Sequence, residues 1–166
     1  MNSERYLGGL YDANSGHIHP LNYTLGLARA ALAAGVTIYT ASAVTKITRR
    51  SKANVCITTN GQVTAQQVLF CGNAYMGKLV PEISNKIMPV GTYIGASEPL
   101  GKARAEALIN NDMAVADINF VLDYFRLSAD YRMLFGGRVS YSTIAPANLK
   151  HTMQQRMLNV FPQLAD

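Results

Sequence analysis

The chain has 166 residues, of which 49% are hydrophobic and 15% are charged. This composition is typical of a globular protein with enough apolar material for a core, and it excludes an intrinsically disordered chain. Fifteen Lys and Arg residues against ten Asp and Glu residues give a formal net charge of +5. The densest basic run, residues 46–52, coincides with a predicted hairpin turn. We interpret it as a solvated turn and expect no nucleic-acid binding.

The two cysteines, Cys56 and Cys71, lie inside apolar runs and have neither metal-binding nor redox spacing. We expect both to be small buried hydrophobic residues in a reducing, cytoplasmic setting. No segment reaches the length of a membrane span, and the first residues lack the pattern of a signal peptide. No membrane association is therefore expected.

The first clear element is a helix that begins at Pro20 and ends before Gly35. Pro20 suits the first helical position and Gly35 suits the left-handed residue after the end. The apolar residues that recur at helical spacing are Leu21, Leu25, Ala28 and Leu32.

From Val36 the apolar period changes to two, which predicts strands at 36–42, 43–50 and 54–59. Asn60-Gly61 then marks a tight hairpin turn, because both residues tolerate positive φ. The following strand, 62–72, becomes fully apolar towards its end, as a buried strand would.

The second half contains five further elements. A strand at 87–98 is broken by two glycines, and a short helix covers 99–109. Two strands form a hairpin around Ala129-Asp130. The last element is a helix that stops at Phe161, before Pro162, and its apolar face carries Leu149, Met153, Met157 and Val160.

The segment from Gly72 to Lys78 matches a phosphate-binding P-loop except at the next position, where Leu79 replaces the Ser or Thr that holds magnesium. Leucine cannot ligate a metal, so we exclude a nucleotide triphosphatase. A strand that enters a glycine turn before a helix still suits an anionic cofactor. A tight turn without a ligand is equally consistent with the spacing.

His17 and His19 would share one face of a strand, which is half of a metal site at most. We predict no metal ion. A more suggestive group combines Tyr124 and Arg126, which alternate on one strand, with Gly136-Gly137, which allow close approach to the backbone. Arg138 and Tyr141 extend this group. A guanidinium there could hold a carboxylate, and the alternative is a surface arginine with aromatic packing.

The order of these pieces resembles a known family. "GHIHPLNYTLGLARAALAAGVTIYTASAVTKI", the Asn-Gly hairpin and "VLFCGNAYMGKL" are similar to FAD-dependent oxidoreductases of the D-amino-acid-oxidase-like superfamily. "MPVGTYIGASEPL" and "YFRLSADYRMLFGGRVSYS" are most similar to its gamma-glutamylputrescine oxidoreductase branch. The resemblance extends from about Gly9 to Leu164.

The resemblance implies an α+β fold with interleaved domains. Residues 20–80 would be a helix and β-meander from an FAD domain. Residues 1–19 and 81–166 would form a mixed or antiparallel substrate-domain sheet with flanking helices.

The resemblance also implies roles for particular residues. Val44 would meet the adenine end of FAD, and Cys71, Gly72 and Asn73 would run along its ribose and pyrophosphate. The sheet that roofs the flavin would supply cofactor contacts at Gly136 and Gly137 and substrate contacts at Tyr124 and Arg126. The substrate would be a small-molecule amine or amino acid, whose C–N bond is oxidised with electrons passing to oxygen.

The G-x-G-x-x-G fingerprint with which such enzymes grip the FAD pyrophosphate does not occur in these 166 residues. The glycine-rich segment that closes over the flavin is not found either. We therefore expect a partial oxidoreductase that binds FAD weakly or not at all by itself and is inactive alone. The alternative is a non-catalytic binding or oligomerisation module that self-associates through exposed sheet edges. In a third reading, another chain supplies the missing FAD unit.

Overall fold

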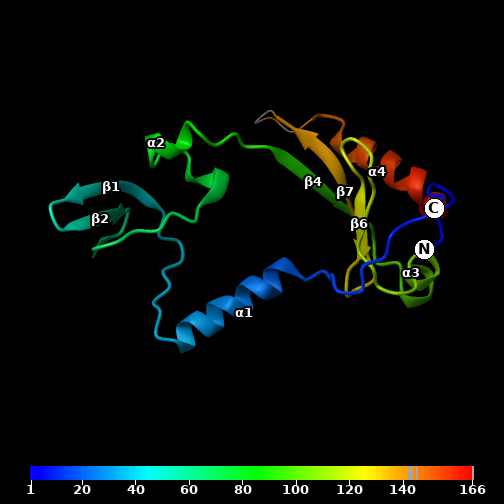
Figure 1. The fold of residues 1–166 in the computed structure, drawn as a ribbon, viewed down its shortest axis with the longest axis horizontal. Coiled ribbons are helices and arrows are strands. Elements are labelled where there is room, and N and C mark those ends of the chain that lie inside the picture. The colour runs from blue at the N-terminus through cyan, green and yellow to red at the C-terminus, as the bar shows by residue number, and fades with distance from the viewer. Residues whose placement is uncertain (142–143, 145, 166) are drawn as a thin grey trace. The chain divides into compact units, whose positions relative to one another are not determined.

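The computed structural model describes residues 1–141, 144 and 146–165 (Figure 1). The chain forms two compact units, His19–Pro89 and a second unit made of Met1–Ile18 with Val90–Asp166. Helices accompany two separate antiparallel sheets, which confirms the α+β class. The assignment of 20–80 to an FAD domain and the rest to a substrate domain stays a prediction.

Helix α1 (Pro20–Ala33) opens the first unit as predicted. His19 caps it, because its Nδ1 accepts the backbone N–H of Asn22 at 3.3 Å. Gly35 follows the end of the helix with φ +87°, a conformation that glycine adopts without strain. None of the residues in α1 is buried.

The predicted meander is confirmed by strands β1 (Val44–Arg50), β2 (Ala53–Thr58) and β3 (Gln62–Ala65), which pair in that order. The Asn-Gly turn joins β2 to β3, and the N–H of Thr58 donates to the carbonyl of Gly61 at 2.9 Å. Val55 on β2 is 3% exposed and is the buried hydrophobic residue of this unit.

Two strand predictions in this unit are wrong. Residues 36–42 and 66–72 form no strand, and Cys71 is exposed rather than buried. A strand requires a hydrogen-bonded neighbour, and no described segment pairs with either stretch. The unit continues through a 3₁₀ turn, η1 (Asn73–Met76), to the short helix α2 (Pro81–Ser84).

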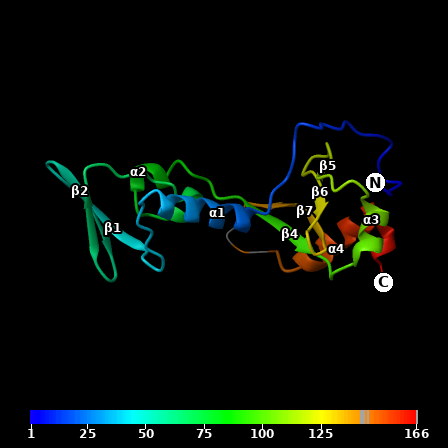
Figure 2. The same cartoon turned by 90° about the horizontal axis from the view of Figure 1, so that it is seen from below.

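The second unit contains an antiparallel sheet in the order β4-β7-β6-β5 (Figure 2). Its strands are β4 (Gly91–Ala96), β5 (Val115–Ala116), β6 (Tyr124–Leu127) and β7 (Met133–Ser140). The predicted β6–β7 hairpin is confirmed. Gly95 lies inside an unbroken β4, so the predicted break there is wrong, because the ladder to β7 holds the strand together.

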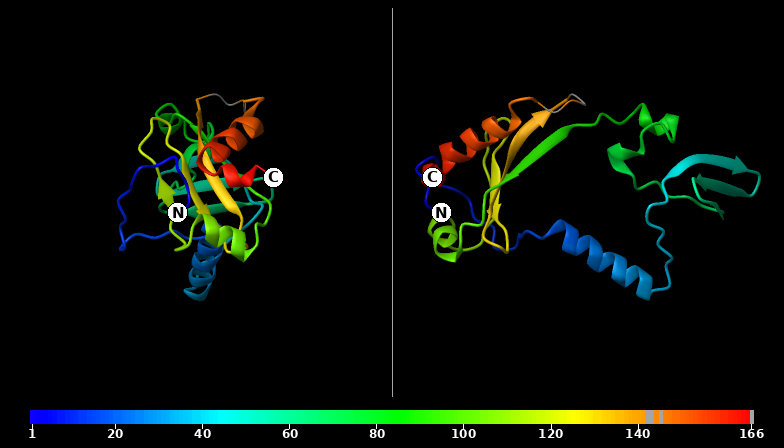
Figure 3. Two further views of the ribbon diagram at one scale, coloured as in Figure 1. Left: turned by 90° about the vertical axis from the view of Figure 1, so that its right-hand side faces the viewer. Right: turned by 180° about the vertical axis from the view of Figure 1, so that it is seen from behind.

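Three helices accompany this sheet: α3 (Lys102–Leu108), α4 (Leu149–Val160) and the 3₁₀ turn η2 (Pro162–Leu164). Helix α4 packs along β7 and ends at Phe161, as predicted (Figure 3). The hydrophobic core lies between the helices and one face of the sheet. Its buried members are Ala105, Leu108, Ile109, Phe125, Leu127, Met133, Phe135, Met153, Val160 and Phe161.

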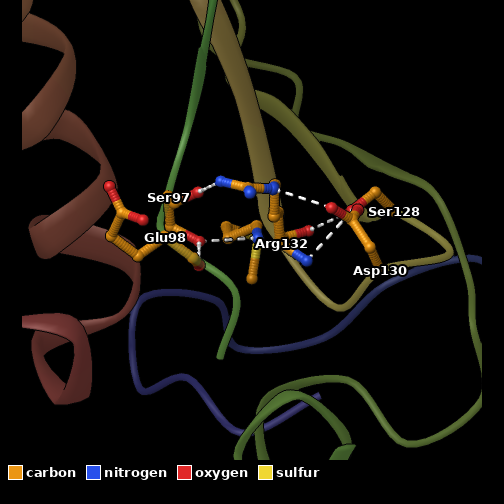
Figure 4. A network of polar contacts seen from close by, with 6 residues as sticks. Ser97, Glu98, Ser128, Asp130 and Arg132 are labelled. Carbon is orange, nitrogen blue, oxygen red and sulfur yellow. Dashed lines mark hydrogen bonds and ion pairs between the residues drawn. The ribbon is translucent and has the colours of Figure 1, made fainter. Parts of the chain in front are cut away.

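The turn of the β6–β7 hairpin is fastened to the end of β4 by a polar network (Figure 4). Asp130 accepts hydrogen bonds from the hydroxyl of Ser128 and from Nε of Arg132, the latter at 2.8 Å. Arg132 also donates to the carbonyl of Ser97 at 3.0 Å. The hydrogen bond from Ser128, and after it the one from Arg132, lowers the pKa of Asp130.

Candidate functional site

Tyr124 and Arg126 share one face of β6, as predicted. Both are half-buried, whereas Phe125 and Leu127 between and beyond them point into the core. The face that carries Tyr124 and Arg126 is therefore the face turned away from the hydrophobic core. We call it the outer face of the sheet.

Gly136 on β7 lies directly opposite Tyr124 on the same face. A Cβ built on Gly136 would lie 2.1 Å from Cε2 of the Tyr124 ring. The ring thus covers the glycine, and only a residue without a side chain fits beneath it. In this structure the close approach predicted at Gly136 is made by a tyrosine of the neighbouring strand.

Gly137 also lies where a side chain would clash with a neighbour, in this case on the core side of the sheet. A Cβ there would lie 2.5 Å from Oδ1 of Asp123. Asp123 is 5% exposed, and its Oδ1 accepts a 2.7 Å hydrogen bond from Nε of Arg156 on α4. Arg156 also donates to the carbonyl of Val121 at 2.7 Å. Sequence reasoning missed this pair, because no local pattern connects a strand entry with a helix 33 residues later.

Arg138 on β7 does not join Tyr124 and Arg126 on the outer face, although the prediction from sequence grouped it with them. Consecutive residues Tyr93 and Ile94 on β4 pair with Arg138 and Gly136 on β7, so Gly137 is an extra residue in β7. Such a β-bulge reverses the alternation beyond it. Directly paired residues share a face, so Arg138 lies with Tyr93 on the core side of the sheet.

Arg126 makes three hydrogen bonds, all to neutral acceptors. Nη1 donates to Nδ1 of His17 at 3.1 Å and to the carbonyl of Leu127 at 3.5 Å. Nη2 donates to the carbonyl of Ile18 at 3.1 Å. Among the described residues, Nε has no acceptor.

The surroundings of the Arg126 guanidinium therefore differ from those of two other arginines in the unit, which have carboxylate partners. Arg132 pairs with Asp130 and Arg156 pairs with Asp123, each through a carboxylate. No carboxylate of the described residues lies within 4.0 Å of the Arg126 guanidinium. A half-buried cation without a counter-ion attracts an anionic ligand group.

A second long-range contact, also missed from sequence, ties the N-terminal segment to the sheet. The hydroxyl of Tyr6 donates to Oδ2 of Asp117 at 3.2 Å, and its ring stacks on Phe125. Burial, and then the neighbouring charge of Asp117, raises the pKa of Tyr6 to about 12. Both residues line a hollow of about 1020 Å³ between the N-terminal segment and residues 111–119.

The glycine turn of the first unit differs from the predicted strand end. Asn73, not Gly72, has positive φ, at 47°. The N–H groups of Ala74 and Tyr75 are already bonded, to Oδ1 of Asn73 and to the carbonyl of Gly72. These two N–H groups are therefore not free for an anionic ligand, because the helix start here is a single 3₁₀ turn with local hydrogen bonds.

The turn nevertheless borders a hollow of about 330 Å³, whose lining includes Asn73, Lys78, Ser84 and Asn85. The residues 19–89 around it contain seven basic and one acidic side chain, and the other unit contains eight basic and nine acidic ones. The whole positive excess of the chain thus lies in the first unit. A lysine, two amides and a hydroxyl around a small hollow fit a phosphate-like anion.

Val44 lies 37% exposed at the start of β1, where a bulge interrupts its pairing with β2. His17 and His19 do not form a metal pair. One hydrogen-bonds to Arg126 and the other caps α1. Within the described residues, no group of three or more His, Cys, Asp or Glu side chains could hold a metal ion. The helices that the structure describes are all too short or too polar to span a bilayer.

Comparison with known proteins decides the family. The model of the DAO family, described as FAD dependent oxidoreductase, matches residues 1–166. The chain belongs to this family. DAO-family membership implies FAD as the cofactor and confirms the resemblance inferred from the sequence.

Two curated members of the family are each 44% identical to the chain. One is the probable oxidoreductase OrdL of Haemophilus influenzae, over 168 residues, and the other is the gamma-glutamylputrescine oxidoreductase of Escherichia coli, over 163 residues. The alignments cover 99% and 98% of this chain and 38% of each relative. The chain thus spans well under half the length of the curated relatives that it matches.

A solved structure of similar fold is the glycine oxidase of Geobacillus kaustophilus. The superposition has a TM-score of 0.58 with 20% sequence identity, and it covers 84% of this chain and 37% of the other. At this identity the likeness supports the fold alone.

Proposed function

We propose that this polypeptide is part of an FAD-dependent oxidoreductase that oxidises the C–N bond of a small amine or amino acid. FAD, when bound, would supply the acceptor for a hydride equivalent from the carbon that bears the amine, with oxygen as the final electron acceptor and water consumed in releasing the product. Family membership and the names of the two relatives support this proposal. Because the G-x-G-x-x-G fingerprint is absent from these residues, we expect no activity from the chain by itself.

The observation that carries the substrate class is the unpaired charge of Arg126. Its guanidinium lies on the outer face beside Tyr124, and no described carboxylate neutralises it. A carboxylate on the substrate would supply the missing counter-ion and accept the Nε–H that has no acceptor among the described residues. Arg126 and Tyr124 would therefore bind the acid group of an amino-acid-like amine.

The residues near the glycine turn would hold the anionic part of FAD. Lys78 and Asn73 line the hollow there, and the surrounding unit carries all of the positive excess. Cys71 and Gly72 precede Asn73 in the same turn. The predicted FAD contacts of Val44, Gly136 and Gly137 belong to the same proposal.

The test is the visible absorption spectrum of the purified chain before and after FAD is added. A flavin band that saturates at one FAD per chain supports the proposal, and a protein that gains no band contradicts FAD binding by this chain. If FAD binds, Gly72→Leu should weaken it, because the larger side chain displaces Met76 in the turn.

A charge-matched pair of variants sharpens this test. Lys78→Gln removes the ammonium at the hollow, and Lys86→Gln removes an exposed lysine from the same unit without touching the hollow. We expect the affinity for FAD to fall about tenfold in the first variant only, since one charge-assisted hydrogen bond is lost. An equal loss in both variants would contradict a local site.

The non-catalytic module is the second candidate, and one observation favours it. Helix α1 has no buried residue, and its exposed leucines are available to another surface. Exposed apolar side chains and open sheet edges promote association. A colourless protein that sediments as a dimer or larger species would support this candidate over the oxidoreductase.

A further inference from the structure

The atoms around Arg126 determine the protonation state of the histidine beside it. Nη1 of Arg126 lies 3.1 Å from Nδ1 of His17. A guanidinium has five N–H donors and no acceptor. Nδ1 must therefore present its lone pair to the arginine and carries no proton.

The other ring nitrogen completes the assignment. Nε2 of His17 lies 2.8 Å from the backbone carbonyl of Asp112, which can only accept. Nε2 therefore carries the proton and donates it. The side-chain carboxylate of Asp112 lies 3.7 Å from the same nitrogen and also favours a donor there. The geometry thus selects the neutral Nε2–H tautomer of His17.

His17 and Ile18 together hold the guanidinium at two points. The imidazole binds Nη1 and the carbonyl of Ile18 binds Nη2, from two consecutive residues. The His17 side chain is 22% exposed, so packing limits its own motion. Two fixed acceptors on the two terminal nitrogens restrict the torsions of a side chain that otherwise has large rotamer freedom.

We propose that His17 is a positioning residue, whose neutral Nε2–H imidazole orients Arg126 on the outer face of the sheet. This inference rests on the proposed function in one respect, because a use for the oriented arginine requires the carboxylate-binding role proposed above. The orientation itself depends only on contacts within the second unit.

The first measurement is the histidine ¹⁵N spectrum of the full chain at mildly alkaline pH. His17 should show a protonated Nε2 and an unprotonated Nδ1. His151, exposed on α4, provides an internal reference in the same spectrum. The opposite tautomer at His17 would overturn the proposal.

The second measurement compares two substitutions by the side-chain ¹⁵N signals of Arg126. His17→Ala removes the acceptor and should broaden or shift these signals. His17→Asn places an amide oxygen close to the former Nδ1 and should restore them. Unchanged Arg126 signals in His17→Ala would also overturn the proposal, provided that circular dichroism shows both variants folded.

Titration with glycine, as a probe for an amine that bears a carboxylate, separates the two claims. If Arg126 binds the carboxylate, the affinity should fall about tenfold in His17→Ala and stay within about twofold in His17→Asn. If the unsubstituted chain does not bind glycine while the tautomer and the Arg126 signals behave as expected, the substrate role fails and the positioning role stands.

Discussion

The two units differ in what holds them together. The unit of Met1–Ile18 and Val90–Asp166 buries ten core residues, including the stacked rings of Phe125 and Phe135. The unit of His19–Pro89 buries Val55 and exposes the leucines of α1. Each fully buried large apolar side chain contributes about 1.5–3 kcal/mol. Regular secondary structure can thus form without a large buried core. The unit of residues 19–89 has a helix and a sheet but buries very little.

The largest effect is expected from removing a ring of the core. Phe135 is 1% exposed, and its ring centroid lies 5.6 Å from that of Phe125. Phe135→Ala should lower the free energy of unfolding by about 3–5 kcal/mol through lost burial and a new cavity. Urea denaturation measures this change.

The matched control is Leu69→Ala in the other unit, where the side chain is 87% exposed. We expect a change within about 0.5 kcal/mol there. Equal destabilisation by both variants would break the comparison, because it would require a core in the first unit that includes Leu69.

A smaller effect is expected from breaking the ion pair between Arg156 and Asp123. Arg156→Met keeps most of the side-chain volume but leaves Asp123, whose side chain is 7% exposed, without its partner. Since the arginine side chain is itself 29% exposed, we expect a loss of about 2 kcal/mol rather than the full cost of a buried pair. Arg49→Met on the exposed hairpin provides the control. A loss at Arg49 as large as at Arg156 would contradict the assignment.

The smallest effect is confined to alkaline pH. The pKa of Tyr6 is raised to about 12 in the folded protein, so the unfolded chain releases this proton first. The stabilisation is fully present below pH 10, the unfolded pKa, and is lost as the pH rises towards 12. Tyr6→Phe should flatten this decline. Amide signals of the β2–β3 hairpin, recorded alongside, should not change with the substitution, and an equal change there would argue against a local origin.

Elements with a local signal were predictable from the sequence. The apolar spacing of α1 and α4, the Asn-Gly turn and the β6–β7 hairpin depend on residues a few positions apart. The strands expected at 36–42 and 66–72 failed because alternation shows only that a stretch suits a strand. Whether a neighbour pairs with it depends on distant parts of the chain.

The candidate site, like the fold, was predictable only where a local signal existed. Alternation placed Tyr124 and Arg126 on one face, and the family resemblance pointed to FAD. Their contacts with His17 and Gly136 were not predictable, because those contacts depend on strand register and on a segment more than 100 residues away. The same limit hid the pairing of Asp123 with Arg156.

The extra residue Gly137 reverses the alternation of side chains between the two faces of β7. Before it, even-numbered residues face outward, and after it they face the helices. An alignment that places no gap at Gly137 would shift Arg138 and Val139 by one position and assign each to the wrong environment. Without the bulge, Gly137 would pair with Tyr93 and Arg138 with Thr92, and the guanidinium of Arg138 would turn to the face that carries Arg126. Because Gly137 is accommodated as a bulge, Arg138 stays off the face that carries Arg126.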